Sequence, residues 1–256
     1  MKRKIIKFIS FFIFNNSKRK KFRKKFSPPR NEMLINGFYQ IKGYNNNIIL
    51  VIEGKKKLLP KNKIIQGLQI DINGNNNTLI IELPVVMCAS TISINSSNCY
   101  IKIKKLSEFY NVFMRLHFGY GQNFHCGEHT IFYDTKIIMD GNSHIRIGKE
   151  CLFAGETSIW GADGHSVVDK TTNEVLNANY HPLAIGDHSW IGFRCIITKN
   201  GNLPSNCIVA AGSVVSKTFT ESYTIIAGNP AKIVKKNINW LHISTYKEKQ
   251  NMDEII

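Results

Sequence analysis

The sequence lacks both a long apolar run and any pair of closely spaced cysteines. Its N-terminal apolar stretch, residues 5–14, is interrupted by Lys7 and Ser10 and is well short of the roughly 20 residues that a membrane-spanning helix needs. The six cysteines are scattered and form no C-x-x-C pair, which argues against a zinc or redox site. We therefore expect reduced cysteines in an apolar core, typical of a protein in the reducing cytoplasm.

Acidic residues are also few, at 18 against 34 lysines and arginines, and the formal net charge is +16. Much of the positive charge lies in residues 1–30, which we expect to be an N-terminal extension ending near Pro28–Pro29. A short apolar helix with basic flanks would lie on the inner face of the cytoplasmic membrane, each cation adding about 1 kcal/mol. The alternatives are a solvated basic tail and a secretory signal, but no Ala-x-Ala-type cleavage site follows the apolar stretch.

Residues 34–106 lack the long 3.6-residue periodicity of a helix bundle. Short runs of Ile, Leu and Val alternate with clusters of Asn and Gly, which predict turns because both residues accept positive φ. Several positions repeat after 22 residues, which favours stacked coils with asparagine ladders at their corners over a sandwich of short strands. We assign residues 31–135 to these irregular coils. The repeating pairs are Ile70/Ile92, Ile72/Ile94, Leu79/Ile101, Ile81/Ile103, Asn73/Asn95 and Asn76/Asn98.

The second half of the chain carries a six-residue repeat. An aliphatic or aromatic residue at every sixth position predicts one inward side chain on each face of a three-sided coil with 18 residues per turn. We assign residues 136–234 to this solenoid, with a loop at 166–184, and residues 235–256 to a C-terminal tail. The repeating positions are Ile147, Phe153 and Ile159, and then Ile185, Ile191, Ile197, Leu203, Val209 and Val215.

This repeat resembles that of the hexapeptide-repeat acyltransferases, in particular the sugar and polysaccharide O-acetyltransferases. The resemblance covers residues 137–240 and rests on the segments "GADGHSVVD", "IGDHSWIG", "AAGSVVSK" and "IIAGNPAKIVKKNINW". It implies an all-β fold, a left-handed parallel β-helix with a protruding loop and short N- and C-terminal helical extensions. The segment "TKNGNLPSN" and the 22-residue coils depart from the family pattern, which leaves the shape of the acceptor pocket open.

His165 stands where the six-residue count from Ile159 next falls, directly before the loop. A histidine at the point where a loop leaves a rigid scaffold is a candidate for catalysis. The resemblance implies that His165 is a general base, because a neutral imidazole with a pKa near 6.5 can take a proton from a sugar hydroxyl, worth on the order of 10²–10⁴ in rate. Asp163 or Asp169 would hold the other ring nitrogen, although a loop aspartate also forms turns.

The resemblance further implies acetyl-CoA as the acyl donor and direct transfer without a covalent acyl-enzyme. Backbone amides at Gly192 and Phe193 would stabilise the oxyanion. Trp190 would either wall the pantetheine channel or pack on the core, and two lysines would meet the phosphates. The residues expected to bind acetyl-CoA are Trp190, Gly192, Phe193, Ala211, Ser216, Lys217 and Lys235.

The expected function is acetyl transfer to a sugar hydroxyl of a capsular polysaccharide or lipopolysaccharide, by a homotrimer with its sites between neighbouring solenoids. The alternatives are N-acetylation of a nucleotide-linked amino sugar and a non-catalytic scaffold. Nucleic-acid binding is not expected, since stacking aromatics do not interleave the basic residues. No metal is expected either, because the spacing of a zinc hydratase on this fold is not matched by His117, His125, His129 and His144.

Overall fold

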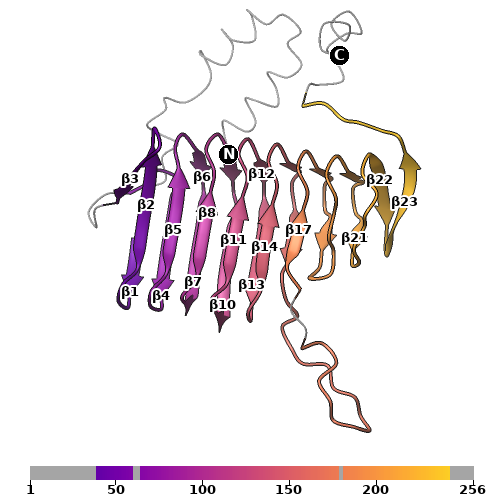
Figure 1. Cartoon of the computed structure of the whole chain (residues 1–256), viewed down its shortest axis with the longest axis horizontal. Coiled ribbons are helices and arrows are strands. Elements are labelled where there is room, and N and C mark those ends of the chain that lie inside the picture. Colours follow the sequence, from indigo (N-terminus) through magenta and orange to yellow (C-terminus); the bar gives the residue numbers. More distant parts are fainter. Residues whose placement is uncertain (1–38, 60–63, 179–180, 243–256) are drawn as a thin grey trace, which may run out of the picture.

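The computed structural model describes residues 39–59, 64–178 and 181–242, which form 23 β-strands and no helix. The strands wind into one elongated coil whose turns stack along its long axis (Figure 1). This confirms the all-β parallel solenoid that the repeats predict. The N-terminal extension expected at residues 1–30 lies outside the described part, as does the C-terminal tail beyond residue 242. A helix able to cross a bilayer is absent from the described ranges.

The strands form three sheets, A, B and C, which are the three faces of the coil. Sheet A contains β1 (Tyr39–Lys42), β4 (Leu68–Asn73), β7 (Ser90–Ser97), β10 (Phe113–Tyr120), β13 (Thr135–Asp140), β16 (Thr157–Trp160), β19 (Ile196–Ile197) and β21 (Val214–Val215). Sheet B contains β3 (Lys55–Leu58), β2 (Asn47–Ile52), β5 (Thr78–Glu82), β8 (Tyr100–Ile103), β11 (Asn123–Cys126), β14 (His144–Ile147) and β17 (Leu183–Ile185). Sheet C contains β6 (Val86–Cys88), β9 (Glu108–Tyr110), β12 (Ile131–Tyr133), β15 (Leu152–Phe153), β18 (Trp190–Ile191), β20 (Ile208–Val209), β22 (Thr224–Gly228) and β23 (Ala231–Lys236).

Neighbouring strands run parallel, except that β3 lies antiparallel to β2 and β23 lies antiparallel to β22. The length of the coils changes as the sequence repeats predict. Between β4 and β16 the paired residues are 21 to 23 positions apart, as for Ile70 and Ile92. Beyond the loop the step is 18, as for Ile197 and Val215, and it is 17 between β20 and β22. Longer coils hold more residues at their corners, where Asn76 takes a φ of 57°.

The inward-facing side chains form one continuous apolar column. The nine positions of the six-residue repeat are each at most 4% exposed, which confirms their predicted direction. In the preceding coils, rings of Phe109, Phe132 and Phe153 stack with centroids 4.9 and 4.5 Å apart. Because each turn places its side chain directly on that of the next, the column is the shared core of the solenoid.

Small polar residues stabilise the corners. Ser189 donates to the carbonyl of Gly186 at 2.9 Å, and Cys195 occupies an equivalent position, with its thiol 3.1 Å from the carbonyl of Ala210. All six cysteines are free; five are buried, as expected, and Cys88 is half-buried. The predicted asparagine ladders also form in the first coils, where the side chains of Asn45 and Asn76 are joined by a hydrogen bond of 3.1 Å and those of Asn46 and Asn77 by one of 3.0 Å.

One long loop leaves the solenoid between β16 and β17, at residues 161–182, and projects well away from it (Figure 1). It folds back on itself through an antiparallel bridge between Val168 and Val175. Across the loop, Ile159 pairs with Ile197, 38 positions later instead of 18. The loop is therefore an insertion into a single coil, and the stacking continues past it.

Candidate active site

One lysine holds the base of the loop. Lys199 follows β19 in the coil after the loop, and its ammonium lies 2.6 Å from the carboxylate of Asp163 and 3.0 Å from the carbonyl of Asn177. The Asn177 side-chain amide donates to Asp163 at 2.8 Å and to the backbone carbonyl of His165 at 2.9 Å. The outgoing and returning limbs of the loop are thus joined to each other and to the solenoid beside His165. We call these three side chains, Asp163, Asn177 and Lys199, the loop clamp.

The loop clamp keeps its carboxylate ionised. The hydrogen bond from Lys199 lowers the pKa of Asp163 and outweighs the opposing effect of its partial burial, and Asn177 adds to the lowering. The Lys199 side chain is only 11% exposed. A cation at such a depth needs its partner, because an unpaired buried charge is strongly destabilising.

His165 lies on the exposed surface of the loop. Ile159 and Ala162 are still buried, so the chain leaves the core between Ala162 and His165. Within the part of the chain that the structure describes, no hydrogen bond is made by the His165 imidazole. Among the described residues, both ring nitrogens of His165 are therefore without a hydrogen-bond partner.

The two aspartates predicted to orient His165 lie in different settings. Asp163 is linked to the His165 segment through Asn177. The Asp169 carboxylate instead accepts the backbone amides of Thr172 at 2.8 Å and Thr171 at 2.7 Å, and these bonds lower its pKa. This is the turn-forming role of a loop aspartate. Neither carboxylate contacts the imidazole among the residues described.

Four of the residues predicted to bind acetyl-CoA gather at the corner between sheets C and A. Trp190 is 38% exposed on β18, Gly192 and Phe193 follow it at the corner, and Ala211 lies at the same corner of the next coil. A Cβ at Gly192 would come within 2.7 Å of the Ala211 nitrogen, so this approach requires glycine. The Gly192 amide already donates to the carbonyl of Val209 at 2.8 Å, which removes it as an oxyanion donor. In the described chain the Phe193 amide makes no such bond.

Trp190 also belongs to an aromatic cluster that the sequence did not predict. After β23 the chain returns over sheet C, and Trp240 stacks on His188 with ring centroids 4.5 Å apart. The Trp240 indole donates to the His188 carbonyl at 2.9 Å. The Trp190 and Trp240 rings are 5.9 Å apart. Trp190 therefore has a packing role and an exposed face at once.

The other predicted acetyl-CoA residues lie elsewhere. Ser216 and Lys217 are exposed after β21, at the corner between sheets A and B from which the loop also departs. Lys235 is exposed on β23. Sheet A therefore separates the corner with His165 from the corner with Trp190, and one copy of the described chain does not bring the two groups into a single cleft.

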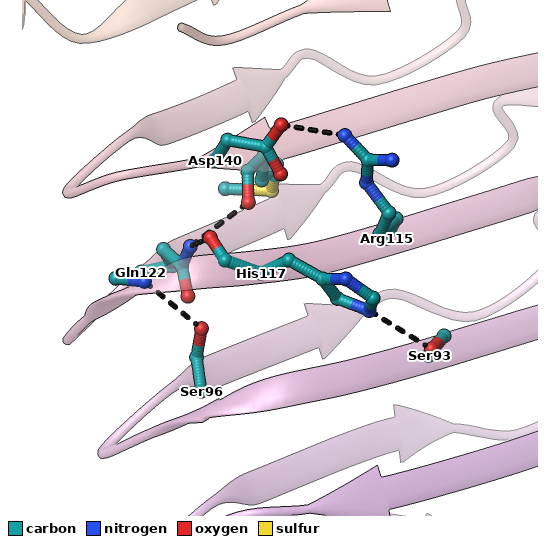
Figure 2. A network of polar contacts seen from close by, with 8 residues as sticks. Ser93, Ser96, Arg115, His117, Gln122 and Asp140 are labelled. Carbon is teal, nitrogen blue, oxygen red and sulfur yellow. Dashed lines mark hydrogen bonds and ion pairs between the residues drawn. The ribbon is translucent and has the colours of Figure 1, made fainter. Parts of the chain in front are cut away.

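A second polar network lies on sheet A, in the coils before the loop (Figure 2). Arg115 on β10 forms an ion pair with Asp140 on β13 at 2.5 Å, and a ring nitrogen of His117 lies 3.2 Å from the Ser93 hydroxyl. Burial and the nearby Arg115 lower the pKa of His117. His125 and His144 lie instead on sheet B. Within the described ranges, no group of three or more His, Cys, Asp or Glu side chains is placed to hold a metal ion.

Comparison with known proteins shows similarity to several O-acetyltransferases. The chain is 27% identical to a polysialic acid O-acetyltransferase of Neisseria meningitidis over 202 residues, 79% of this chain and 88% of the relative. It is 26% identical to the galactoside O-acetyltransferase of Escherichia coli K12 over 121 residues, 47% of this chain. It superposes on a crystallised polysialic acid O-acetyltransferase with a TM-score of 0.71 at 26% identity, covering 86% of this chain and 100% of that one. The chain is related to the hexapeptide-repeat O-acetyltransferases.

The similarity to the hexapeptide-repeat O-acetyltransferases covers only part of the length of several relatives. The chain spans 58% of the galactoside enzyme, and 58% and 62% of relatives from Saccharomyces cerevisiae and Dictyostelium discoideum. A structure of a second polysialic acid acetyltransferase superposes with a TM-score of 0.57 at 21% identity, which shows the fold alone. No family model matches the chain.

Sequence reasoning missed Lys199 and Asn177, which hold the loop in this relative of the hexapeptide-repeat O-acetyltransferases. A signal for Lys199 was present, because "TKNGNLPSN" departs from the family pattern directly after the buried Ile197. Asn177 gave no comparable signal, since the loop around it follows no repeat.

Proposed function

We propose that the chain transfers an acetyl group from acetyl-CoA to a sugar hydroxyl of a capsular polysaccharide or lipopolysaccharide. The observation that supports this most is an exposed histidine, His165, beside the loop clamp on a solenoid that superposes on a polysialic acid O-acetyltransferase. The names of two relatives, a polysialic acid and a galactoside O-acetyltransferase, both describe acetylation of sugars.

In the proposed reaction His165 acts as the general base. Its neutral imidazole takes the proton of the sugar hydroxyl while that oxygen bonds to the acetyl carbonyl carbon. As the carbon–sulfur bond breaks, the same imidazole returns the proton to the departing sulfur. The Phe193 amide is the proposed donor to the carbonyl oxygen. Asp163 acts as a positioning residue, because it reaches the His165 segment through Asn177.

The proposed site is shared between copies of a homotrimer. His165 and Trp190 lie near opposite edges of sheet A in one chain, so a cleft that contains both needs a second copy. His165, Asp163 and Asp169 would come from one copy. The acetyl-CoA site would come largely from its neighbour, through Trp190, Phe193 and Ala211, with Ser216, Lys217 and Lys235 as further candidates. We place the enzyme in the cytoplasm, with residues 1–30 at the inner face of the membrane.

The test is a His165→Gln variant of the full chain, assayed with acetyl-CoA and a bacterial surface glycan. We expect kcat to fall by on the order of 10²–10⁴, because general-base catalysis contributes about that much. A His129→Asn variant is the matched control: His129 is an exposed corner histidine with a φ of 57°, which asparagine also accepts. Unchanged transfer by His165→Gln would remove His165 from the mechanism, and an amide product in place of an ester would indicate N-acetylation.

A further inference from the structure

The outer face of sheet B carries a groove that the proposed reaction leaves without a role. It has a volume of about 390 Å³ and extends over β8, β11 and β14. One end lies at Pro182, where the returning limb of the loop rejoins the solenoid before β17. The side chains that line it include Tyr100, Asn123, His125, His144 and Arg146.

His125 and Arg146 line this groove and belong to a ladder of basic side chains that continues beside it on sheet B. The parallel register pairs Lys102 with His125, and His125 with Arg146, on three adjacent strands. Neighbouring strands are about 4.8 Å apart, so the three side chains stand next to one another on the same face. Lys104 follows Lys102 by two residues and shares its face. We call these four residues, Lys102, Lys104, His125 and Arg146, the basic ladder.

Negative charge near the basic ladder is scarce. Glu82 lies 3.3 Å from Lys102 and 3.2 Å from Lys104, and it is the one carboxylate paired with the ladder in the described chain. Arg146 is exposed and has no ion pair there. Burial and the charges of Arg146, Lys102 and Lys104 lower the pKa of His125, and its buried Nδ1 has no hydrogen-bond partner among the described residues. An anion in the groove would offset this excess of positive charge.

We propose that this groove binds a carboxylate-bearing segment of the acceptor glycan. Arg146 presents a planar fork of N–H donors that matches a carboxylate, and Lys102 adds a second cation two strands away, beyond His125. Tyr100 offers a half-exposed ring against which a sugar ring can pack, while Asn123 and His144 offer hydrogen bonds to hydroxyl groups. The inference rests on the proposed function, since it identifies the acceptor of that reaction as an acidic glycan.

The position of the groove fits this role. Leu183 pairs with Ile145, so Pro182 lies beside His144 at the end of the groove. A glycan held along the basic ladder would therefore continue toward the loop that carries His165. The groove would hold the part of the chain that is not reacting, and an acidic polymer would gain more from it than a single sugar.

Equilibrium binding without acetyl-CoA tests the inference. The probes are oligosialic acid and oligogalacturonic acid, each compared with its own carboxyl-reduced form on the full-length protein. We expect an acidic oligomer to bind roughly tenfold more tightly than its reduced form, because hydrogen bonds to charged groups are the stronger ones. Added salt should weaken the binding of the acidic probe and leave the binding of the reduced probe unchanged.

A Lys102→Gln/Arg146→Gln variant should lose this preference. The matched control is Lys42→Gln/Lys136→Gln, which removes the same charge from exposed positions on sheet A. Equal binding of both acids and their reduced forms would overturn the inference. A groove variant that binds the acidic probes as well as the control variant does would also overturn it. If that groove variant changes only the oligomeric state, the face joins copies of the chain instead of binding a glycan. Binding without acetyl transfer would instead contradict the proposed function alone.

Discussion

Among single residues, Asp163 is the one whose ionised carboxylate holds the base of the loop in place. Its carboxylate accepts from both other members of the loop clamp, and the Lys199 hydrogen bond holds its pKa below the ordinary value. A group whose pKa is lowered on folding contributes stability above its unfolded-state pKa, which is about 4 for aspartate. That contribution is lost as the pH falls through the lower value of the folded state.

We therefore expect the base of the loop to loosen in acid, below about pH 4. Hydrogen exchange across residues 163–177, corrected for its intrinsic pH dependence, should become faster there while the coils stay protected. An Asp163→Asn variant should show a loop whose exchange no longer depends on this titration. If the variant keeps the same acid-induced loosening as the original protein, another group controls the loop.

The residue types at this site were only partly predictable. His165 was identified because it interrupts a regular pattern, and such an interruption is visible in the sequence itself. Lys199 and Asn177 act by meeting across a loop, and their contact depends on how a 38-residue step closes in space. Gly192 shows the opposite case. Its place beside the next coil fits the six-residue repeat. Its amide donates to the carbonyl of Val209, however, which the sequence could not reveal.

Among the structural elements, the segment after β23 packs against coils that come earlier in the chain. Trp240 is buried against His188 and Trp190, and a ring nitrogen of His242 lies 3.4 Å from the carbonyl of Glu150 in the preceding coil, so the tail fastens neighbouring coils from outside. The sequence gave no sign that the chain returns over sheet C after β23. The coil lengths were predictable because stacked coils must keep their residues in register. The return of the tail depends on a contact between residues about 50 positions apart and follows no repeat.

Removal of the Trp240 side chain should weaken this fastening. We expect Trp240→Ala to lower the free energy of unfolding by about 3–5 kcal/mol, as for other large buried side chains. Chemical denaturation followed by circular dichroism would measure it. The neighbouring Leu241 is 39% exposed, and Leu241→Ala should change the stability by no more than about 0.5 kcal/mol. Equal effects of the two substitutions would show that the tail does not fasten the coils.

At the scale of the whole molecule, a site shared between copies predicts that two defective variants regain activity when they are mixed. His165→Gln and Trp190→Ala should each be inactive alone, because each removes one half of the proposed site. Mixed oligomers, unfolded and refolded together, should regain part of the acetyl transfer, since some sites then combine an intact His165 with an intact Trp190 from a neighbour. Sedimentation of each variant would check that assembly is unchanged. Inactive mixtures would indicate that each site is built within one copy.

The two antiparallel strands at the extremities have a consequence for how such copies meet. A parallel stack could in principle be lengthened by another molecule that adds its strands to an open edge. β3 reads "KKKL" and β23 reads "AKIVKK", and the six lysines of these two strands are all exposed. Reversed direction and concentrated positive charge both oppose such end-on growth. Filament formation is thereby discouraged on sheets B and C, and association through the flanks is favoured.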